Sequence, residues 1–310
     1  MKSSIPVAIT IRSFNLSGPA FKKLEENCTL SFINKTGERL SETDLMKALA
    51  NVQGVIAGTE IFSRRVIDQC NSLKVISRVG VGIDSIDLGA AQEKGIRIVT
   101  TPDSPVQSVA EHTLALALCV LKNIPRYNEQ MRKKNHAVTA GTLLSEKTVG
   151  IAGMGRIGTR VAELFECLGC HIFFYDPMVT RQTPSAWKRV DSIEDLVECS
   201  DIVSIHATPQ ADGSPLIDAN VLSHANGITL INTARGTLID EQSLISALSS
   251  GKVKAAALDV FPSEPYSGGL LSFPQVIATP HVASNTVESR LQMEMESVNN
   301  LIKSLKDAGL

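Results

Sequence analysis

The stretch TVGIAGMGRIG, residues 148–158, joins a short apolar run to the beginning of a helical pattern. Its glycines have the spacing G-x-G-x-x-G and are Gly153, Gly155 and Gly158. A second apolar run, His171–Tyr175, follows and ends at the acidic residue Asp176. A strand, a glycine turn, a helix and a second strand ending in an acid form the βαβ unit that binds dinucleotides. The glycine string alone is weak evidence, and its context supports the inference.

Each part of this unit has a physical role. Gly153 permits the tight turn, Gly155 lets the backbone approach a pyrophosphate, and Gly158 allows the helix to pack closely. The helix N-terminus offers N–H groups and the positive end of a dipole to the phosphates. Asp176 would accept hydrogen bonds from the adenosine ribose, and its charge would repel a 2′-phosphate. We therefore predict NAD rather than NADP, against the alternative of a glycine turn with no ligand.

A second glycine string, Gly80-Val81-Gly82, also follows an apolar run. It has Ser85 where a third glycine would stand, and no strand ending in an acid follows at the usual distance. We interpret it as a tight loop whose backbone N–H groups suit a carboxylate.

Outward from residues 148–158, short apolar runs alternate with helical patterns in both directions. The predicted strands are Pro6–Ile11, Gly54–Ala57, Leu73–Ile76, Ile96–Val99, Thr148–Ala152, His171–Tyr175, Ile202–His206, Thr229–Asn232, Ala255–Leu258 and Ile277–Thr279. Helices are predicted at Glu42–Ala50, Arg65–Cys70, Val109–Leu121 and Ile157–Leu168, and over the amphipathic tail Asn285–Leu310. This alternation predicts an α/β protein with parallel, doubly wound sheets.

Composition and charge exclude several classes of protein. The net charge is -2, which gives no basic surface for nucleic acid or an anionic membrane. The longest apolar stretch, Val109–Leu121, contains Glu111 and His112 and is too short to span a bilayer. The run after residues 1–4 is too short for a signal peptide, so we expect no leader. We expect Cys167 and Cys170, a single C-x-x-C, to be reduced thiols of a cytoplasmic protein rather than a redox or zinc pair.

Three ionisable residues follow three of the late strands. Arg235 comes after Thr229–Asn232, Glu264 after the strand at 255–258, and His281 after the strand at 277–279. Ligands bind at the carboxyl ends of strands in such sheets. A guanidinium binds a carboxylate with two hydrogen bonds, and an imidazole beside a carboxylate donates a proton near neutral pH. We therefore assign Arg235 to substrate binding, His281 to acid–base chemistry and Glu264 to supporting His281. Each residue taken singly has an ordinary structural explanation.

Six strings together resemble the D-isomer-specific 2-hydroxyacid dehydrogenases, the family that includes phosphoglycerate dehydrogenase, and the resemblance covers nearly the whole chain. They are Arg78-Val-Gly-Val-Gly-Ile-Asp84, Ser108-Val-Ala-Glu-His112, the motif from Gly153, Asn232-Thr-Ala-Arg-Gly236, residues 259–265 and Thr279-Pro-His-Val-Ala-Ser284. The resemblance implies an NAD-dependent oxidoreductase that moves a hydride between a nicotinamide and C2 of a small 2-hydroxy or 2-keto acid. It implies the same catalytic set of Arg235, Glu264 and His281, and no metal.

The resemblance also implies an architecture. A flavodoxin-like substrate domain would comprise residues 1–98 and 286–310, and a larger Rossmann domain, residues 99–285, would be inserted in it with the active site in the cleft. A homodimer would form through the Rossmann domain and the polar arm at 122–145. The Val79, Gly80 and Val81 amides would hold the substrate carboxylate. The further residues expected to contact NAD are Arg156, Ile157, Thr233, Ala234 and Asp259, besides the three glycines and Asp176.

The identity of the acid stays open at this point. Relatives that act on 3-phosphoglycerate often carry Arg-Ser where this chain has Ala57-Gly-Thr-Glu60, which weakens that substrate, although other arginines could bind a phosphate. Glyoxylate, hydroxypyruvate and pyruvate-like acids are the alternatives. We expect no regulatory domain after Leu310. His206, at a strand end, is assigned to the adenosine side rather than to catalysis.

Two other functions are alternatives. A non-catalytic NAD-sensing protein of the corepressor type would keep the nucleotide site, but the complete Arg235, Glu264 and His281 set favours an enzyme. Formate dehydrogenases have no alkoxide to protonate and usually pair the histidine with glutamine, so Glu264 argues against that activity.

Overall fold

The computed structural model describes residues 5–180 and 182–310. The chain divides into two compact units. Unit 1 contains the residues up to Pro105 together with Thr286–Leu310, and unit 2 is Val106–Asn285. The chain therefore passes from unit 1 to unit 2 after Pro105, rather than after residue 98 as expected. It returns to unit 1 after Asn285. Residues 1–4 of the predicted first domain lie outside the described residues.

Unit 1 is built on a five-stranded parallel sheet with the order β2-β1-β3-β4-β5. Its strands are β1 Pro6–Ile9, β2 Thr29–Ile33, β3 Gly54–Ala57, β4 Val75–Arg78 and β5 Arg97–Val99. Its helices are α1 Pro19–Asn27, α2 Glu42–Leu49, α3 Arg64–Gln69, α4 Leu88–Glu93 and α11 Val287–Asp307. This strand order is that of the flavodoxin-like doubly wound fold.

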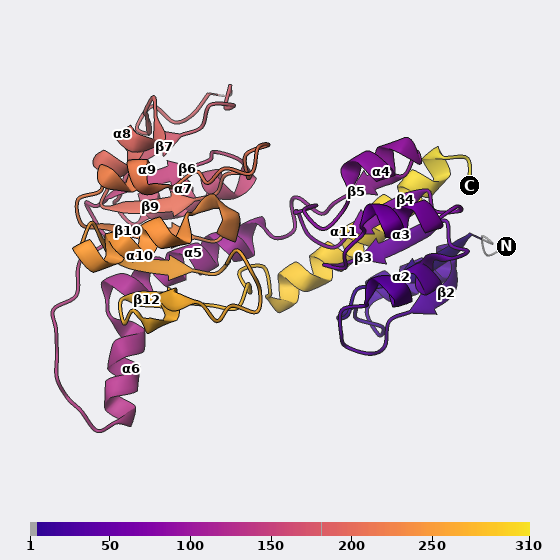
Figure 1. Cartoon of the computed structure of the whole chain (residues 1–310), viewed down its shortest axis with the longest axis horizontal. Helices are drawn as coiled ribbons and strands as arrows, with labels where there is room; N and C mark the ends of the chain where they lie inside the picture. Colours follow the sequence, from indigo (N-terminus) through magenta and orange to yellow (C-terminus); the bar gives the residue numbers. More distant parts are fainter. Residues whose placement is uncertain (1–4, 181) are drawn as a thin grey trace. The chain divides into compact units, whose positions relative to one another are not determined.

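Unit 2 contains a seven-stranded parallel sheet with the order β12-β11-β10-β9-β6-β7-β8 (Figure 1). Its strands are β6 Thr148–Ala152, β7 His171–Tyr175, β8 Lys188–Arg189, β9 Ile202–Ile205, β10 Ile228–Asn232, β11 Val253–Leu258 and β12 Val276–Ala278. Its helices are α5 Val106–Leu121, α6 Ile124–Arg132, α7 Arg156–Cys167, α8 Ile193–Glu198, α9 Ala219–Ser223 and α10 Glu241–Ser250, with 3-10 turns η1 Gly236–Leu238 and η2 Gly269–Ser272. The strand order reverses between β6 and β9, which makes this the switch point of a Rossmann sheet. The predicted fold class is confirmed.

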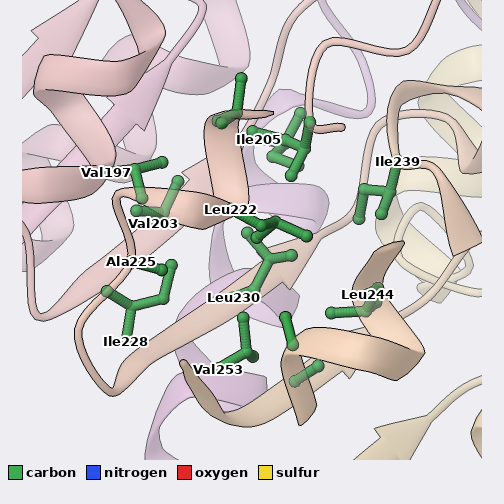
Figure 2. Close-up of a cluster of buried hydrophobic side chains, with 14 of the residues drawn as sticks. Val197, Val203, Ile205, Leu222, Ala225, Ile228, Leu230, Ile239, Leu244 and Val253 are labelled. Atoms are coloured by element: carbon green, nitrogen blue, oxygen red, sulfur yellow. The ribbon is translucent and has the colours of Figure 1, made fainter. Parts of the chain in front are cut away.

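The central strands of unit 2 are apolar because helices cover both of their faces. Val203 and Leu230 on one face of the sheet pack with Leu244 of α10, as Figure 2 shows. On the other face, Ile151 of β6 packs with Phe165 of α7. Truncating a buried leucine such as Leu230 to alanine typically costs about 2–5 kcal/mol. These two layers fix the carboxyl ends of β6 and β9–β12 at one edge of the sheet.

Helix α11 lies against the sheet of unit 1, although it is the last element of the chain (Figure 1). Its buried side chains include Met293, Val298 and Leu301. Leu301 fits there because a Cβ at Gly54 would lie 2.8 Å from its Cδ1 atom. The predicted tail helix is present, but its first apolar position, Val287, is 73% exposed and belongs to no core.

The predicted buried helix Val109–Leu121 is the body of α5, with seven buried residues along its length. Within residues 5–180 and 182–310, none of the helices combines the length and the apolar character needed to cross a lipid bilayer.

The C-x-x-C pair lies at the end of α7. Gly169 has φ 81°, the left-handed conformation expected of a helix cap. The Cys170 thiol is buried and donates to the Leu144 carbonyl at 3.3 Å, whereas Cys167 is exposed. Burial raises the pKa of Cys170 to about 11, which disfavours the thiolate form at neutral pH.

Several elements were not predicted. Strand β2 is an edge strand with no fully buried residue, α6 buries none of its residues, and β8 has two residues. Helix α1 was also missed, and it buries Ala20 and Leu24. Apolar periodicity indicates an element only when one of its faces is buried, which explains the omission of β2 and α6.

Candidate active site

The glycine turn between β6 and α7 has the geometry that a dinucleotide requires. Gly153 has φ 98°, and a Cβ there would lie 2.7 Å from the backbone of residues 206–207. A Cβ at Gly158 would lie 1.9 Å from the Gly153 carbonyl oxygen. Gly155 is different, because nothing lies within 4 Å of its Cβ position. The outer glycines are therefore required by the turn itself, and the space beside Gly155 is open to a ligand.

Helix α7 begins at Arg156 and Ile157 without a side-chain cap, because its N-cap residue is Gly155. Other helices of unit 2 are capped, for example α8 by Ser192 and α10 by Asp240. The N-terminus of a helix presents backbone N–H groups and the positive end of its dipole, which suit an anion. The open space, the uncapped helix and the switch point together fit the pyrophosphate of a dinucleotide.

Asp176 follows β7 and lies beside the glycine turn. Its Oδ2 accepts a hydrogen bond from the Met154 amide at 2.7 Å, and Oδ1 accepts from the amides of Met178 and Val179 at 2.8 and 3.1 Å. The carboxylate therefore helps to hold the turn. Each oxygen has two lone pairs, so Oδ2 can still accept a ribose hydroxyl. That contact stays a prediction.

His206 lies at the end of β9, directly under the glycine turn. Its Nε2 atom is 2.8 Å from the Ser204 hydroxyl, and its Cβ atom would be 3.3 Å from a Cβ at Gly158. Burial lowers the pKa of this imidazole to about 3. The lowered pKa favours the neutral imidazole, and the assignment of His206 to the adenosine side rather than to catalysis stays a prediction.

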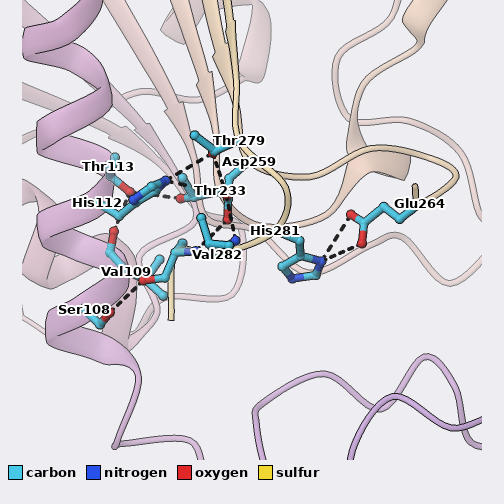
Figure 3. Close-up of polar contacts among 11 residues, drawn as sticks. Ser108, Val109, His112, Thr113, Thr233, Asp259, Glu264, Thr279, His281 and Val282 are labelled. Carbon is cyan, nitrogen blue, oxygen red and sulfur yellow. Dashed lines mark hydrogen bonds and ion pairs between the residues drawn. The ribbon is translucent and has the colours of Figure 1, made fainter. Parts of the chain in front are cut away.

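Glu264 and His281, which are predicted to act as an acid–base pair, are in direct contact. The Nδ1 atom of His281 is 2.9 Å from Oε2 and 3.1 Å from Oε1 of Glu264 (Figure 3). Glu264 also accepts the amide of Phe261 at 3.3 Å, and the stacked rings of Phe261 and Tyr266, with centroids 4.1 Å apart, stiffen the loop that carries it. Because Nδ1 is engaged, Nε2 is the ring nitrogen left for a substrate. Both side chains are partly exposed, as reacting groups must be.

Arg235 follows β10 by three residues. Its carbonyl oxygen accepts from the Asn232 side chain at 2.8 Å, and its guanidinium donates to the Ala234 carbonyl at 2.7 Å. A Cβ at Gly236 would lie 2.0 Å from the Phe261 carbonyl carbon, so the loops after β10 and β11 touch. Since β10, β11 and β12 are neighbouring parallel strands, the three predicted catalytic residues follow strands that end at one edge of the sheet.

Two residues predicted to contact NAD point into the protein. The hydroxyl of Thr233, which is 8% exposed, lies 2.9 Å from the Thr113 hydroxyl. Asp259 is 0% exposed. Its Oδ1 accepts from the Thr279 hydroxyl at 2.6 Å and from the Val282 amide at 2.9 Å. The buried carboxylate therefore holds the loop that carries His281, and contact of Asp259 with NAD stays a prediction.

The predicted substrate loop belongs to unit 1. The Val79 amide donates to the Ala57 carbonyl at 2.9 Å, and the Gly80 amide donates to the Thr101 hydroxyl at 2.7 Å. These two N–H groups are engaged within the unit and are not open to a carboxylate. Of the three amides predicted to bind the substrate carboxylate, only that of Val81 stays a candidate, and this residue is 43% exposed. The positive φ of Gly80, 134°, makes the bend.

Some residues around the site were missed by the sequence reasoning. Ser108 and His112 of α5 contact the loop around His281. Ser108 contacts Ala283 and His112 contacts Thr279 (Figure 3). The sequence contains their strings but does not show their roles, because the partners lie more than a hundred residues away in sequence.

The fold, the open glycine turn and the acid–base pair define a protein of the nicotinamide dinucleotide-binding class. Residues 114–283 match the sequence model described as D-isomer specific 2-hydroxyacid dehydrogenase, NAD binding domain. The chain belongs to the D-isomer specific 2-hydroxyacid dehydrogenase family, as the resemblance predicted.

Three similar proteins illustrate the range of this family. The D-3-phosphoglycerate dehydrogenase of Methanocaldococcus jannaschii is 38% identical over 81% of this chain and 49% of its own length. The chain thus spans about half the length of that relative. The hydroxypyruvate reductase of Thermotoga maritima is 33% identical over 91% of this chain and 96% of its own length. An NADPH-dependent glyoxylate/hydroxypyruvate reductase of Sinorhizobium meliloti, solved with NADP and malonate, superposes with a TM-score of 0.85 at 28% identity, covering 96% of this chain and 93% of that one.

Proposed function

We propose that this protein is an NAD-dependent D-2-hydroxyacid dehydrogenase, which transfers a hydride between the nicotinamide and C2 of a small 2-hydroxy or 2-keto acid. The observation that carries the proposal is the contact between Glu264 and His281, 2.9 Å from Oε2 to Nδ1, in loops that follow β11 and β12 of the sheet that also presents the glycine turn. A protein that only sensed NAD would have no need of this pair.

The bound cofactor, NADH in the direction of reduction, supplies the hydride. When C2 of the keto acid accepts the hydride, its carbonyl oxygen becomes an alkoxide. This alkoxide takes a proton from Nε2 of His281. Glu264 favours the imidazolium form before the transfer and fixes the ring orientation. Arg235 offers a planar guanidinium to the substrate carboxylate. The products are the hydroxy acid and NAD⁺, and the reverse reaction uses neutral His281 as the base.

We infer that the substrate carries no phosphate. In the stretch Ala57–Glu60, where relatives that act on 3-phosphoglycerate often carry Arg-Ser, Glu60 is 1% exposed and accepts the Gly58 amide at 2.6 Å. A buried acceptor cannot bind a phosphate. The match to nearly the full length of a hydroxypyruvate reductase also favours glyoxylate or hydroxypyruvate over 3-phosphoglycerate.

The experiment is to follow NADH oxidation with glyoxylate, hydroxypyruvate, pyruvate and 3-phosphohydroxypyruvate. We expect turnover with the acids that lack phosphate. The variant His281→Asn should lose at least about a hundredfold in kcat while NADH still binds, because general acid–base catalysis contributes about 10²–10⁴. Full activity of this variant would contradict the assignment, and a preference for the phosphorylated acid would overturn the substrate proposal.

We further propose that the protein is a homodimer. Apolar side chains are exposed along α6 and the arm after it, with Ile124 at 52%, Met131 at 56% and Val138 at 86% exposure. An exposed set of this kind is typical of an interaction site. A second copy is the occupant that the family resemblance implies.

A cytoplasmic location is our inference from the cysteines. All six are free thiols, which is typical of proteins kept in a reducing compartment.

A further inference from the structure

Helix α5 touches the loop that carries His281 at two points. The Ser108 hydroxyl donates to the Ala283 carbonyl oxygen at 2.7 Å, and this hydrogen bond is buried. One turn further along, His112 Nε2 lies 3.2 Å from the Thr279 hydroxyl. Residues four apart share a helix face. The two contacts therefore hold the loop on both sides of His281 from one face of α5 (Figure 3).

The backbone of His281 needs such support. Its φ is 54°, a left-handed conformation that is unusual for a residue other than glycine and that persists only where the surroundings impose it. The surroundings here are centred on Asp259. Its carbonyl oxygen accepts the His281 amide at 2.8 Å, and its carboxylate accepts the amides of Val282 and Ala283, each at 2.9 Å.

The direction of the hydrogen bonds identifies what His112 contributes. The Thr279 hydroxyl gives its only hydrogen to Asp259 at 2.6 Å, so in its contact with His112 it must be the acceptor. His112 therefore carries its proton on Nε2 and donates it. The same nitrogen is 3.5 Å from Asp259 Oδ1. Among the described residues, two side chains donate to this buried carboxylate. Thr279 directly follows β12, and His112 is the one that comes from a helix.

The electrostatics of Asp259 agree with this arrangement. Burial alone would raise the pKa of its carboxyl group, but the contacts with His112, with Thr279 and with the two loop amides outweigh burial and hold the pKa below its usual value. An ionised carboxylate inside a protein is stable only while its donors are in place. Loss of one donor would therefore loosen the others, which are the bonds that shape the His281 loop.

We propose that His112 is a positioning residue for the reaction: its Nε2–H group, through Thr279 and Asp259, holds the His281 loop in the conformation that keeps the imidazole on Glu264. This inference rests on the proposed function, because it takes His281 to be the proton donor. It gives the Ser108–His112 string a role that lies away from the reacting atoms.

The test compares three variants. His112→Leu removes the donor, His112→Gln places an amide donor where Nε2 stands, and Glu111→Ala alters an exposed neighbour whose carboxylate contacts Gln107 of the same helix. We expect kcat for 2-keto acid reduction to fall about tenfold or more in His112→Leu, because small displacements of reacting groups are costly. We expect His112→Gln to recover most of this loss and Glu111→Ala to match the wild type. The Kd for NADH should be unchanged in all three.

A second readout does not depend on turnover. The ring ¹H–¹³C NMR signal of His281, assigned by its absence in His281→Asn, should move in His112→Leu and stay in place in Glu111→Ala. An unchanged kcat and an unchanged His281 signal in a folded His112→Leu protein would overturn the proposal. If the wild type reduces none of the acids, the proposed function fails, and the NMR comparison still decides whether His112 positions His281.

Discussion

The imidazole of His206 links the nucleotide turn to the stability of the fold. Its pKa is lowered from 6.5 to about 3 by burial, so between these values the unfolded chain binds a proton that the folded chain does not. The contribution of His206 to the free energy of unfolding is therefore fully present above pH 6.5. It is lost as the pH falls, by up to about 1.4 kcal/mol per pH unit. We expect His206→Asn to lose less stability than the wild type between about pH 7 and pH 5, measured as the urea midpoint. His224→Asn, at an exposed histidine, is the control and should behave as the wild type.

Asp176 sets a second expectation at the residue scale. Its charge stands beside the turn, held by the Met154 amide at 2.7 Å. Asp176→Asn keeps one oxygen for that bond and removes the repulsion of a 2′-phosphate. We expect the ratio of kcat/KM for NADPH to that for NADH to rise about tenfold, which corresponds to about 1.4 kcal/mol. Unchanged selectivity in a folded variant would show that another residue discriminates between the cofactors.

The residues at strand ends could be predicted, because glycine, arginine, glutamate and histidine beside a turn are visible in the sequence. Their hydrogen-bond partners could not. The burial of Asp259 depends on Thr279 and His112, and the amide of Gly80 is taken by Thr101, all far away in the chain. A sequence shows which group is polar but not which distant donor satisfies it.

At the scale of the element, the βαβ turn offers a matched pair of glycine substitutions. A Cβ at Gly155 meets nothing within 4 Å and its φ is −67°, so Gly155→Ala should fold with an unchanged Tm. We expect it to weaken NADH binding about tenfold or more, because the methyl group occupies the space where the backbone approaches the pyrophosphate. Gly158→Ala should lower the Tm instead, since its Cβ would lie 1.9 Å from a carbonyl oxygen. Fluorescence titration with NADH and thermal unfolding separate the two effects, and an equal NADH affinity in Gly155→Ala and the wild type would contradict the binding geometry.

Elements with a buried apolar run could be predicted within a few residues, and β6 and β7 have the bounds that the sequence indicated. Two of the exceptions share one cause. Strand β2 lies at a sheet edge and its apolar residues are only partly buried, and α6 has no buried residue, so neither has the fully buried face that apolar periodicity detects. The apolar residues of α6 are exposed in the single chain, which agrees with our proposal that a second copy covers them.

The whole molecule is two parallel-sheet units, each with its own apolar core. The resemblance predicted this division, which composition alone could not, because both halves have the same alternation of strands and helices. The arm after α6 is held to it by Tyr127, whose hydroxyl accepts the Thr139 amide at 3.1 Å. This segment exposes apolar side chains, and it is the surface where we propose that a second copy packs.

This surface can be tested on the intact protein. We expect the wild type to sediment as a dimer at micromolar concentration. The double variant Met131→Glu with Val138→Glu should sediment as a monomer, because two buried charges without partners cost several kcal/mol at an interface. Leu168→Glu, at an apolar residue of unit 2 that is 44% exposed and lies outside the arm, is the matched control and should stay dimeric. Equal sedimentation coefficients for the double variant and the control would remove the arm from the interface, whereas a monomeric double variant that still binds NADH would show that the arm serves assembly rather than the nucleotide site.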